Sequence, residues 1–197
     1  MRSDLLAKSE TYAREVLENF SEDFHYHDVH HTLNVVQATT RIAGKSDVKG
    51  EELENLLVAA WFHDLGYQAG REDHEEESVR IMRHKLEEWS IPNGKIREIE
   101  RLILATRMPH QPTDVLTRII CDADLYHLCQ PDFPKYSERL RKEINCTCSK
   151  NIDPTEWIKM NLEFMKNHRY FTDYGKKVLR PLKSKIMSRI AQMVSKS

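Results

Sequence analysis

The 197 residues are enough for one domain with a sizeable core and leave little room for two. Lysine and arginine together number 30 against 31 aspartates and glutamates, so the whole-chain charge gives no reason to bind nucleic acid or an anionic membrane. No apolar run approaches the length of a membrane span, and the first residues lead into an amphipathic helix rather than a signal peptide, which predicts a cytoplasmic protein with four reduced cysteines.

Helical periodicity runs through nearly the whole chain, and the six glycines and seven prolines are few. The pattern predicts helices over residues 4–19, a segment ending near 43, 51–65, 74–89, 95–107, 113–128 (with Thr113 as a candidate cap), 136–145, 154–168, and a last one after 172. No heptad persists and no linker or repeat is present. We therefore expect an all-α fold, a single-domain helical bundle of about eight to ten helices covering 1–197.

The segment 61–67 combines a histidine–aspartate pair with the end of the central predicted helix. Gly66 is suited to a left-handed C-cap of that helix. The helix has one buried face, marked by Leu53, Leu56, Leu57 and Ala60. His63 and Asp64 are thus expected at its buried end, where an unpaired carboxylate is costly. A divalent cation is one partner that stabilises both side chains.

Two more polar residues are predicted to face the core. His31 shares a helix face with Val35, Ala38 and Ile42, and Asp124 follows Ile120 by four residues. Taken singly, each of these side chains has an ordinary explanation, such as a backbone hydrogen bond or an ion pair with a lysine or arginine. Taken together, two imidazoles and two carboxylates form a ligand set for Mn, Fe, Co, Ni, Zn or Mg.

Three motifs, in this order, resemble those of the HD superfamily of metal-dependent phosphohydrolases. They read YHDVHHTL at 26–33, LVAAWFHDLGY at 57–67 and ICDADL at 120–125. The resemblance extends over about 24–125, which places a motif core at 24–128 with C-terminal helices at 131–197 packing on it. Residues 157–172 continue the likeness to small stand-alone bacterial members.

The resemblance implies that His31, His63, Asp64 and Asp124 bind the metal, with one or two ions in total. Asp124 is preferred to Asp122 because it matches the Ala-Asp-Leu core of the last motif, which leaves Asp122 as a neighbour of the ligands or a helix-surface charge. In two-metal members further histidines bind the second ion. The candidates here are His74 and His110, for which solvated surface positions are the alternative.

The activity implied is hydrolysis of a phosphomonoester or phosphodiester, with a nucleotide or another small phosphate ester as substrate and a metal-activated water as nucleophile. Asp64, beside His63, is expected to orient that water or to accept its proton. Residues that contact the substrate are predicted to include His27, Arg107, Arg71 and Arg141, although each is as readily a solvated residue.

Two other functions fit the same residues. One is a metal- and nucleotide-binding sensor with little turnover, and the other is a di-iron oxygenase of the HD type. Nucleic acid is an unexpected partner, because the basic residues after Lys135 alternate with Glu138 and Glu143 and are typical of a solvated helix face. The sequence leaves open a monomer or a homodimer. The aromatic residues of the C-terminal part are expected either to cover the pocket or to form a dimer face: Trp157, Phe164, Tyr170, Phe171 and Tyr174.

Overall fold

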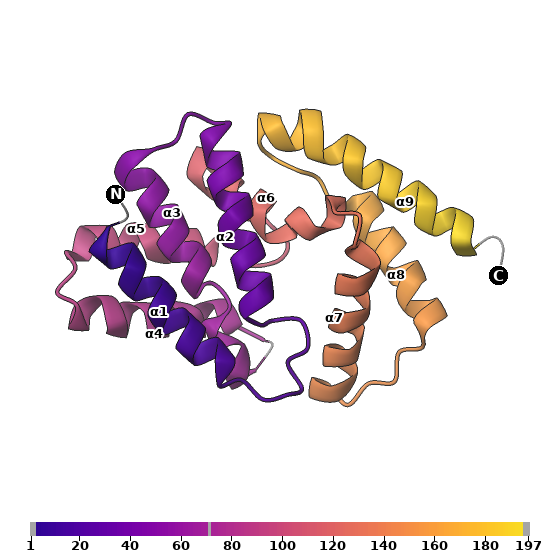
Figure 1. The fold of residues 1–197 in the computed structure, drawn as a ribbon, viewed down its shortest axis with the longest axis horizontal. Helices are drawn as coiled ribbons and strands as arrows, with labels where there is room; N and C mark the ends of the chain where they lie inside the picture. Colours follow the sequence, from indigo (N-terminus) through magenta and orange to yellow (C-terminus); the bar gives the residue numbers. More distant parts are fainter. Residues whose placement is uncertain (1–2, 71, 195–197) are drawn as a thin grey trace.

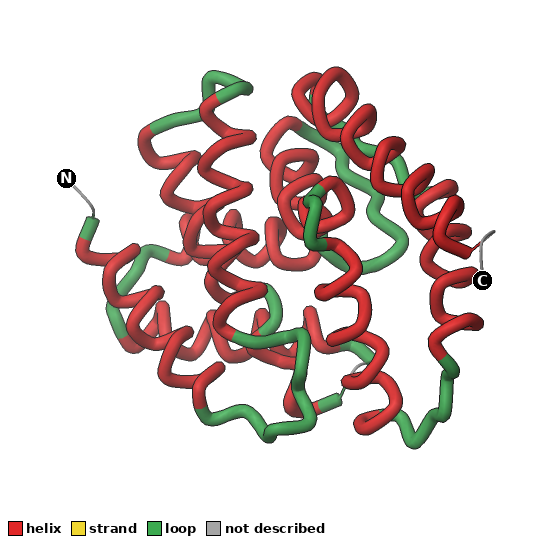
Figure 2. Tube along the Cα trace, turned by 45° about the vertical axis from the view of Figure 1, so that its right-hand side comes forward, coloured by secondary structure: helices red, strands yellow, loops and turns green. Residues whose placement is uncertain are grey.

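A computed structural model describes residues 3–70 and 72–194, and these residues form helices and loops without a strand (Figures 1 and 2). The predicted all-α fold is therefore confirmed. The elements in chain order are α1 (Asp4–Glu18), α2 (Val29–Gly44), α3 (Gly50–Phe62), the 3-10 helix η1 (Leu65–Ala69), α4 (His74–Glu88), α5 (Asn93–Leu104), α6 (Val115–Asp124), the 3-10 helix η2 (Leu125–Cys129), α7 (Phe133–Thr147), α8 (Pro154–Asn167), the π-helix η3 (Gly175–Leu179) and α9 (Arg180–Val194).

Several helices begin at an aspartate that caps them. Asp28 accepts from two amides of α2, and Asp153 accepts from two amides of α8, which then starts at Pro154. At α6 the cap is Asp114, which forms a capping box with Thr117, so the prediction of Thr113 as cap is wrong by one residue. These caps satisfy amides that a helix cannot pair internally.

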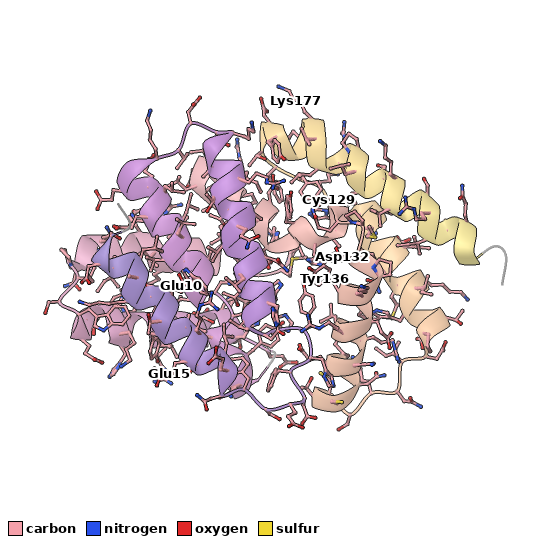
Figure 3. All side chains as sticks on the ribbon, viewed as in Figure 1. Glu10, Glu15, Cys129, Asp132, Tyr136 and Lys177 are labelled. Atoms are coloured by element: carbon pink, nitrogen blue, oxygen red, sulfur yellow. The ribbon has the colours of Figure 1, made fainter. Side chains whose placement is uncertain are left out.

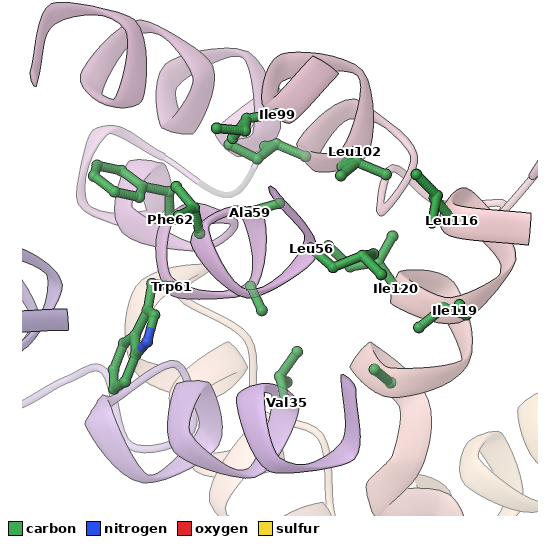
Figure 4. Close-up of a cluster of buried hydrophobic side chains, with 14 of the residues drawn as sticks. Val35, Leu56, Ala59, Trp61, Phe62, Ile99, Leu102, Leu116, Ile119 and Ile120 are labelled. Atoms are coloured by element: carbon green, nitrogen blue, oxygen red, sulfur yellow. The ribbon is translucent and has the colours of Figure 1, made fainter. Parts of the chain in front are cut away.

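Helix α3 lies at the centre of the main core. Leu56, Ala59, Trp61 and Phe62 are almost completely buried, and residues of α2, α5 and α6 pack around them, including Val35, Ile99 and Ile120 (Figure 4). A helix that is apolar on most sides is stable only inside a protein. The end of α3, where His63 and Asp64 follow, is therefore held in a fixed place by packing.

Helices α7, α8 and α9 lie together beyond α6 (Figure 1) and share a smaller apolar cluster formed by Leu128, Phe133, Met165 and Ile186. Tyr136 of α7, labelled in Figure 3, accepts a hydrogen bond from Asn34 of α2 at 3.0 Å. Tyr170, which precedes η3, and Leu179, the last residue of η3, belong to the main core instead. The C-terminal helices thus contact the motif-bearing helices; that residues 1–197 form one domain stays a prediction.

Within the described ranges, every helix is too short or too polar to cross a membrane.

Candidate metal centre

His31 is positioned by the cap of α2. The Asp28 carboxylate accepts hydrogen bonds from the amides of His30 and His31, at 3.0 and 2.9 Å, and fixes the first turn of the helix. The other Asp28 oxygen accepts from Arg139 of α7 at 2.5 Å. The first turn of α2 therefore presents the His31 imidazole inward, where it is buried.

His63 and Asp64 follow the last turn of α3. The His63 Nδ1 donates to the carbonyl of Ala60 at 2.9 Å, which leaves Nε2 as the nitrogen with a lone pair. The chain then enters η1, where Gly66 has no positive φ, so the expected left-handed C-cap is wrong. Gly66 is required for another reason: a Cβ there would lie 2.2 Å from the carbonyl oxygen of His74 and 2.6 Å from the amide nitrogen of Ser78. This close approach lets α4 pack against η1.

Four side chains from three helix ends meet at one point. The Asp64 Oδ2 lies 3.1 Å from His31 Nε2 and 3.0 Å from His63 Nε2, and the Asp124 Oδ1 lies 3.7 and 3.6 Å from the same two nitrogens. Ligand atoms of His31, His63 and Asp124 all fall within 4.8 Å of one another. Ligands of one Zn²⁺-sized ion stand roughly 3 to 3.5 Å apart, given bonds of about 2.1 Å. The arrangement can therefore hold a metal ion.

The hydrogen bonding of the cluster fits an ion as well. The His63 Nε2 and the Asp64 Oδ2 are both buried and have no hydrogen-bond partner among the described residues, although they lie 3.0 Å apart. Buried polar atoms without a hydrogen bond need an explanation, and a bound ion between these two would supply it. Burial opposes ionisation of Asp64, but the imidazoles of His63, His31 and His74 outweigh it and hold its pKa well below the usual range. Asp64 is therefore a carboxylate, as a metal ligand must be.

His74 and His110 lie on the outer sides of this cluster. The His74 Nε2 is 3.6 Å from the other Asp64 oxygen, and the His110 Nε2 is 3.5 Å from the other Asp124 oxygen. The His110 side chain is only 3% exposed, and His74 packs against Tyr67. Neither residue is a surface histidine. His74 lines the cavity described below, whereas the His110 Nε2 also hydrogen-bonds to the Thr106 carbonyl at 3.1 Å. That either residue contacts a second ion stays a prediction.

His27 is paired with a carboxylate from a distant helix. Its Nδ1 hydrogen-bonds to Glu143 of α7, and its ring stacks on Tyr67 with centroids 3.6 Å apart. The other Glu143 oxygen accepts from the amides of Tyr26 and His27, at 2.7 and 2.9 Å. Burial opposes ionisation of Glu143, but these contacts outweigh it and lower its pKa. The interpretation of Glu143 as part of a solvated face is wrong, since the residue is 2% exposed.

The remaining predicted site residues lie elsewhere. Asp122 is fully buried, so it is not a surface charge, and its oxygens accept from the Phe171 amide and from the amide and hydroxyl of Thr172 at 2.7 to 2.9 Å. It anchors the segment before η3 rather than the cluster. Arg107 pairs with Asp73 and Glu76, and Arg141 pairs with Glu138 and the carbonyl of Ile152. Neither arginine lines the cavity described below. Arg71 lies outside the described residues.

A cavity of about 1270 Å³ opens from the cluster toward α7 and α8. Its polar end contains His31, Asp64, His74 and Asp124, together with His27 and His127. Burial lowers the pKa of His127 to about 4, so this imidazole is neutral near pH 7 and hydrogen-bonds through Nδ1 to the Tyr26 hydroxyl at 3.0 Å. The opposite wall is apolar, with Leu140 and Ile144 of α7 and Trp157, Met160 and Phe164 of α8. A small molecule can thus reach the cluster from a mostly apolar chamber.

The chain thus combines an all-α fold with histidine and aspartate motifs that meet at a cavity and can hold a metal ion. The sequence matches the family model of the HD domain over residues 28–129, which is more than half of the chain. The chain therefore belongs to the HD domain family. No curated protein matches it significantly.

Solved structures share the fold at low identity. A Lactobacillus plantarum protein has a TM-score of 0.72 and 15% identity, covering 100% of this chain and 96% of its own. A Listeria innocua protein has a TM-score of 0.67 and 17% identity, covering 98% and 94%. A protein of an uncultured Thermotogales bacterium, described as a predicted HD superfamily hydrolase, has a TM-score of 0.65 and 16% identity, covering 97% and 92%. The matches cover 97 to 100% of this chain, so they extend well beyond residues 28–129 of the family match.

Sequence reasoning missed the cavity residues of α7, but it named Trp157 and Phe164 of α8 among aromatic residues that either cover the pocket or form a dimer face, and both line the cavity. Glu143 sits among lysines and arginines at a helical spacing that is typical of solvent-facing residues. Met160 and Phe164 follow a spacing that is equally typical of a core stripe. The signal that pointed to α8 was the concentration of aromatic residues in the C-terminal part of the chain, which includes Trp157 and Phe164.

Proposed function

We propose that this protein is a metal-dependent phosphohydrolase that cleaves a phosphomonoester or phosphodiester bond of a nucleotide or another small phosphate ester. The observation that carries the proposal is the meeting of His31, His63, Asp64 and Asp124 at the end of a cavity, with two buried atoms of the group lacking partners. The description of the Thermotogales protein as a predicted hydrolase supports the same class of reaction.

In this proposal the residues of the cluster have separate roles. His31, His63, Asp64 and Asp124 would hold one divalent ion, and His74 and His110 would contact a second where one is bound. A bound ion lowers the pKa of water and neutralises charge on a phosphoryl group. Asp64, whose Oδ1 faces His74 and whose Oδ2 faces His63, would orient the attacking water. Mn, Fe, Co, Ni, Mg and Zn all accept these nitrogen and oxygen ligands.

His27 is placed to handle the proton of the leaving group. Glu143 engages its Nδ1, so Nε2 is the ring nitrogen left for a ligand in the cavity that His27 lines. A carboxylate behind an imidazole fixes its orientation and stabilises its protonated form. In this proposal His27 donates a proton from Nε2 to the departing oxygen, while Tyr67 supports the ring from one side.

Phosphate release from a panel of nucleotides, cyclic nucleotides and an aryl phosphate tests the proposal, with Mn, Mg, Co or Ni added. The comparison is between the wild type, Asp64→Ala and Asp4→Asn, since Asp4 is 80% exposed on α1 and provides a matched surface control. We expect metal-dependent turnover in the wild type and in the control, and its loss in Asp64→Ala. Metal and nucleotide binding without turnover of any compound would leave the sensor, and redox-active iron near two per chain would indicate the oxygenase.

A further inference from the structure

The cavity has two chemically different ends, and the function proposed above uses only one. Three of the six large apolar side chains that are most exposed among the described residues line this one cavity: Met108 at 48%, Met160 at 47% and Phe164 at 38%. Exposed apolar side chains scattered singly need no explanation, but a group of them around one chamber marks a binding surface. Met108 follows α5, whereas the other two lie on α8, so the chamber is apolar on both sides.

These side chains are separate from the packing that holds the C-terminal helices together. The cluster beneath α8 is formed by Leu128, Phe133, Met165 and Ile186, all at least 93% buried. Trp157, which also lines the cavity, is fixed by hydrogen bonds from its Nε1 to the Ser137 carbonyl and hydroxyl at 2.8 Å. The exposed side chains of the wall are therefore not part of the cluster that packs the C-terminal helices, and Trp157 at its edge is held by hydrogen bonds.

The charges of the lining act against a highly charged ligand. Carboxylates line the cavity at Asp23, Asp64, Glu72, Glu75, Asp124 and Glu143, whereas Lys150 is the one lysine or arginine that lines it in the described part of the chain. Asp64 and Asp124 are balanced by a bound ion, and Glu143 is paired with His27. The acidic residues toward the mouth, Asp23 and Glu72, are exposed and oppose any further negative charge.

We propose that the substrate carries a single phosphoryl group on a large, uncharged and mainly apolar alcohol, which the wall formed by Met108, Leu140, Ile144, Met160 and Phe164 binds. The proposal rests on the function proposed above and narrows its substrate class. The phosphoryl group lies at the metal cluster and the alcohol against α7 and α8. Such an alcohol is either an aryl or long alkyl group or a nucleoside whose base lies against the wall, and the carboxylates of the lining oppose a polyphosphate chain.

Two matched series test the proposal in the holoprotein, with metal in excess. One compares kcat/KM for alkyl phosphates of increasing chain length and for an aryl phosphate, and the other compares a nucleoside mono-, di- and triphosphate. We expect kcat/KM to rise with chain length, by up to about fourfold per buried methylene. In the second series we expect it to fall by roughly fivefold or more with each added phosphate. The alcohol is identified by comparing kcat/KM for the best alkyl or aryl phosphate with kcat/KM for the nucleoside monophosphate.

Variants locate the effect on the wall. Phe164→Ala and Met160→Ala are expected to flatten the chain-length series by raising KM about five- to tenfold more for the long members than for the short ones. Leu182→Ala is the matched control, because Leu182 is 40% exposed on α9 and does not line the cavity. Titration calorimetry with unreactive alkyl phosphonates gives the same comparison without turnover.

The outcomes separate the two proposals. If kcat/KM does not depend on chain length, or is larger for the triphosphate, the proposal of an apolar monophosphate substrate is contradicted, but the proposed hydrolase function is not. Tighter binding of long phosphonates, lost in Phe164→Ala, with no turnover of any ester, supports the apolar site and contradicts the hydrolase. Equal affinity for short and long phosphonates contradicts the role of the wall whatever the activity.

Discussion

The two ends of the cavity differ in the polarity, the spacing and the exposure of their side chains. At one end, four buried polar side chains from α2, α3 and α6 converge within a few ångströms, and their positions are fixed by helix caps and by the packing of α3. At the other end, apolar side chains of α7 and α8 are spread over a wide wall and remain partly exposed. Catalysis requires that a few reacting atoms are placed exactly, whereas selective binding of an apolar group requires a large apolar contact surface. The contrast suggests that chemistry and selectivity are separable by mutation.

The largest expected effect is at the polar end, in Asp64→Asn. The substitution keeps the shape of the side chain but removes the charge that lies 3.0 and 3.1 Å from the two imidazoles. Because a metal ion contributes several kcal/mol of charge stabilisation, we expect kcat to fall by at least about 10³-fold. Metal content measured by mass spectrometry should fall with it, whereas Asp4→Asn should change neither. Full activity in Asp64→Asn would contradict the assignment of Asp64.

Gly66→Ala tests the support beneath that end. The added Cβ would meet the backbone of His74 and Ser78 at 2.2 and 2.6 Å, so α4 must move away from η1. We expect a loss of about 1 to 3 kcal/mol in the free energy of unfolding, measured by chemical denaturation, and a displaced His74.

Gly94→Ala in α5 is the matched control for Gly66→Ala. A Cβ at Gly94 has no atom within 4 Å, so this variant should be as stable as the wild type or more stable by about 0.5 to 1 kcal/mol. Equal stability of the two variants would show that the contact between η1 and α4 is not tight.

Glu143→Gln tests the link between the two ends, because Glu143 belongs to α7 but orients His27. Loss of its charge should cost about 1 to 3 kcal/mol of stability and lower kcat by roughly 10- to 100-fold. The pKa of Glu143 is lowered in the folded protein, so its contribution is complete above its ordinary value of 4.5 and is lost as the pH falls below that value. The difference in melting temperature between wild type and variant should therefore be largest near neutral pH and shrink toward pH 4.

Glu138→Gln, on the same helix, is the control for Glu143→Gln. Its side chain is 42% exposed and pairs with Arg141, a surface contact worth little. A melting-temperature difference for Glu143→Gln that is constant across pH, or a kcat equal to that of Glu138→Gln, would contradict a charged Glu143 behind His27.

The smallest expected effect is at the mouth of the cavity, in Lys150→Ala. Lys150 is exposed, so its attraction for a phosphate is screened. We expect KM for a monophosphate to rise by about two- to fivefold, with kcat unchanged, and the difference to vanish in high salt. A large loss of kcat would instead place Lys150 against the reacting group.

The sequence predicted the polar end much better than the apolar end. His31, His63, Asp64 and Asp124 stood out because a buried imidazole or carboxylate has few explanations, and the structure brings all four together. Their role as ligands stays a prediction. Glu143 was missed because its helix is rich in charge, and only the folded chain shows that this one glutamate faces His27. Of the wall, Trp157 and Phe164 were named among residues that either cover the pocket or form a dimer face, whereas Met160 and the residues of α7 were missed because an apolar side chain beside a cavity follows the same spacing as one in a core. Arg107 and Arg141 were chosen for their charge, and their nearer acidic partners could not be identified from spacing.

The most direct test of the account is the rate of phosphate release from an aryl monophosphate, measured on metal-stripped protein as Mn²⁺ is added. The account predicts a rate that starts near zero, rises to saturation as one or two ions bind per chain, and stays near zero in Asp64→Asn. A rate that is independent of added metal, or saturating binding of metal without release from any ester, would contradict the hydrolytic metal centre.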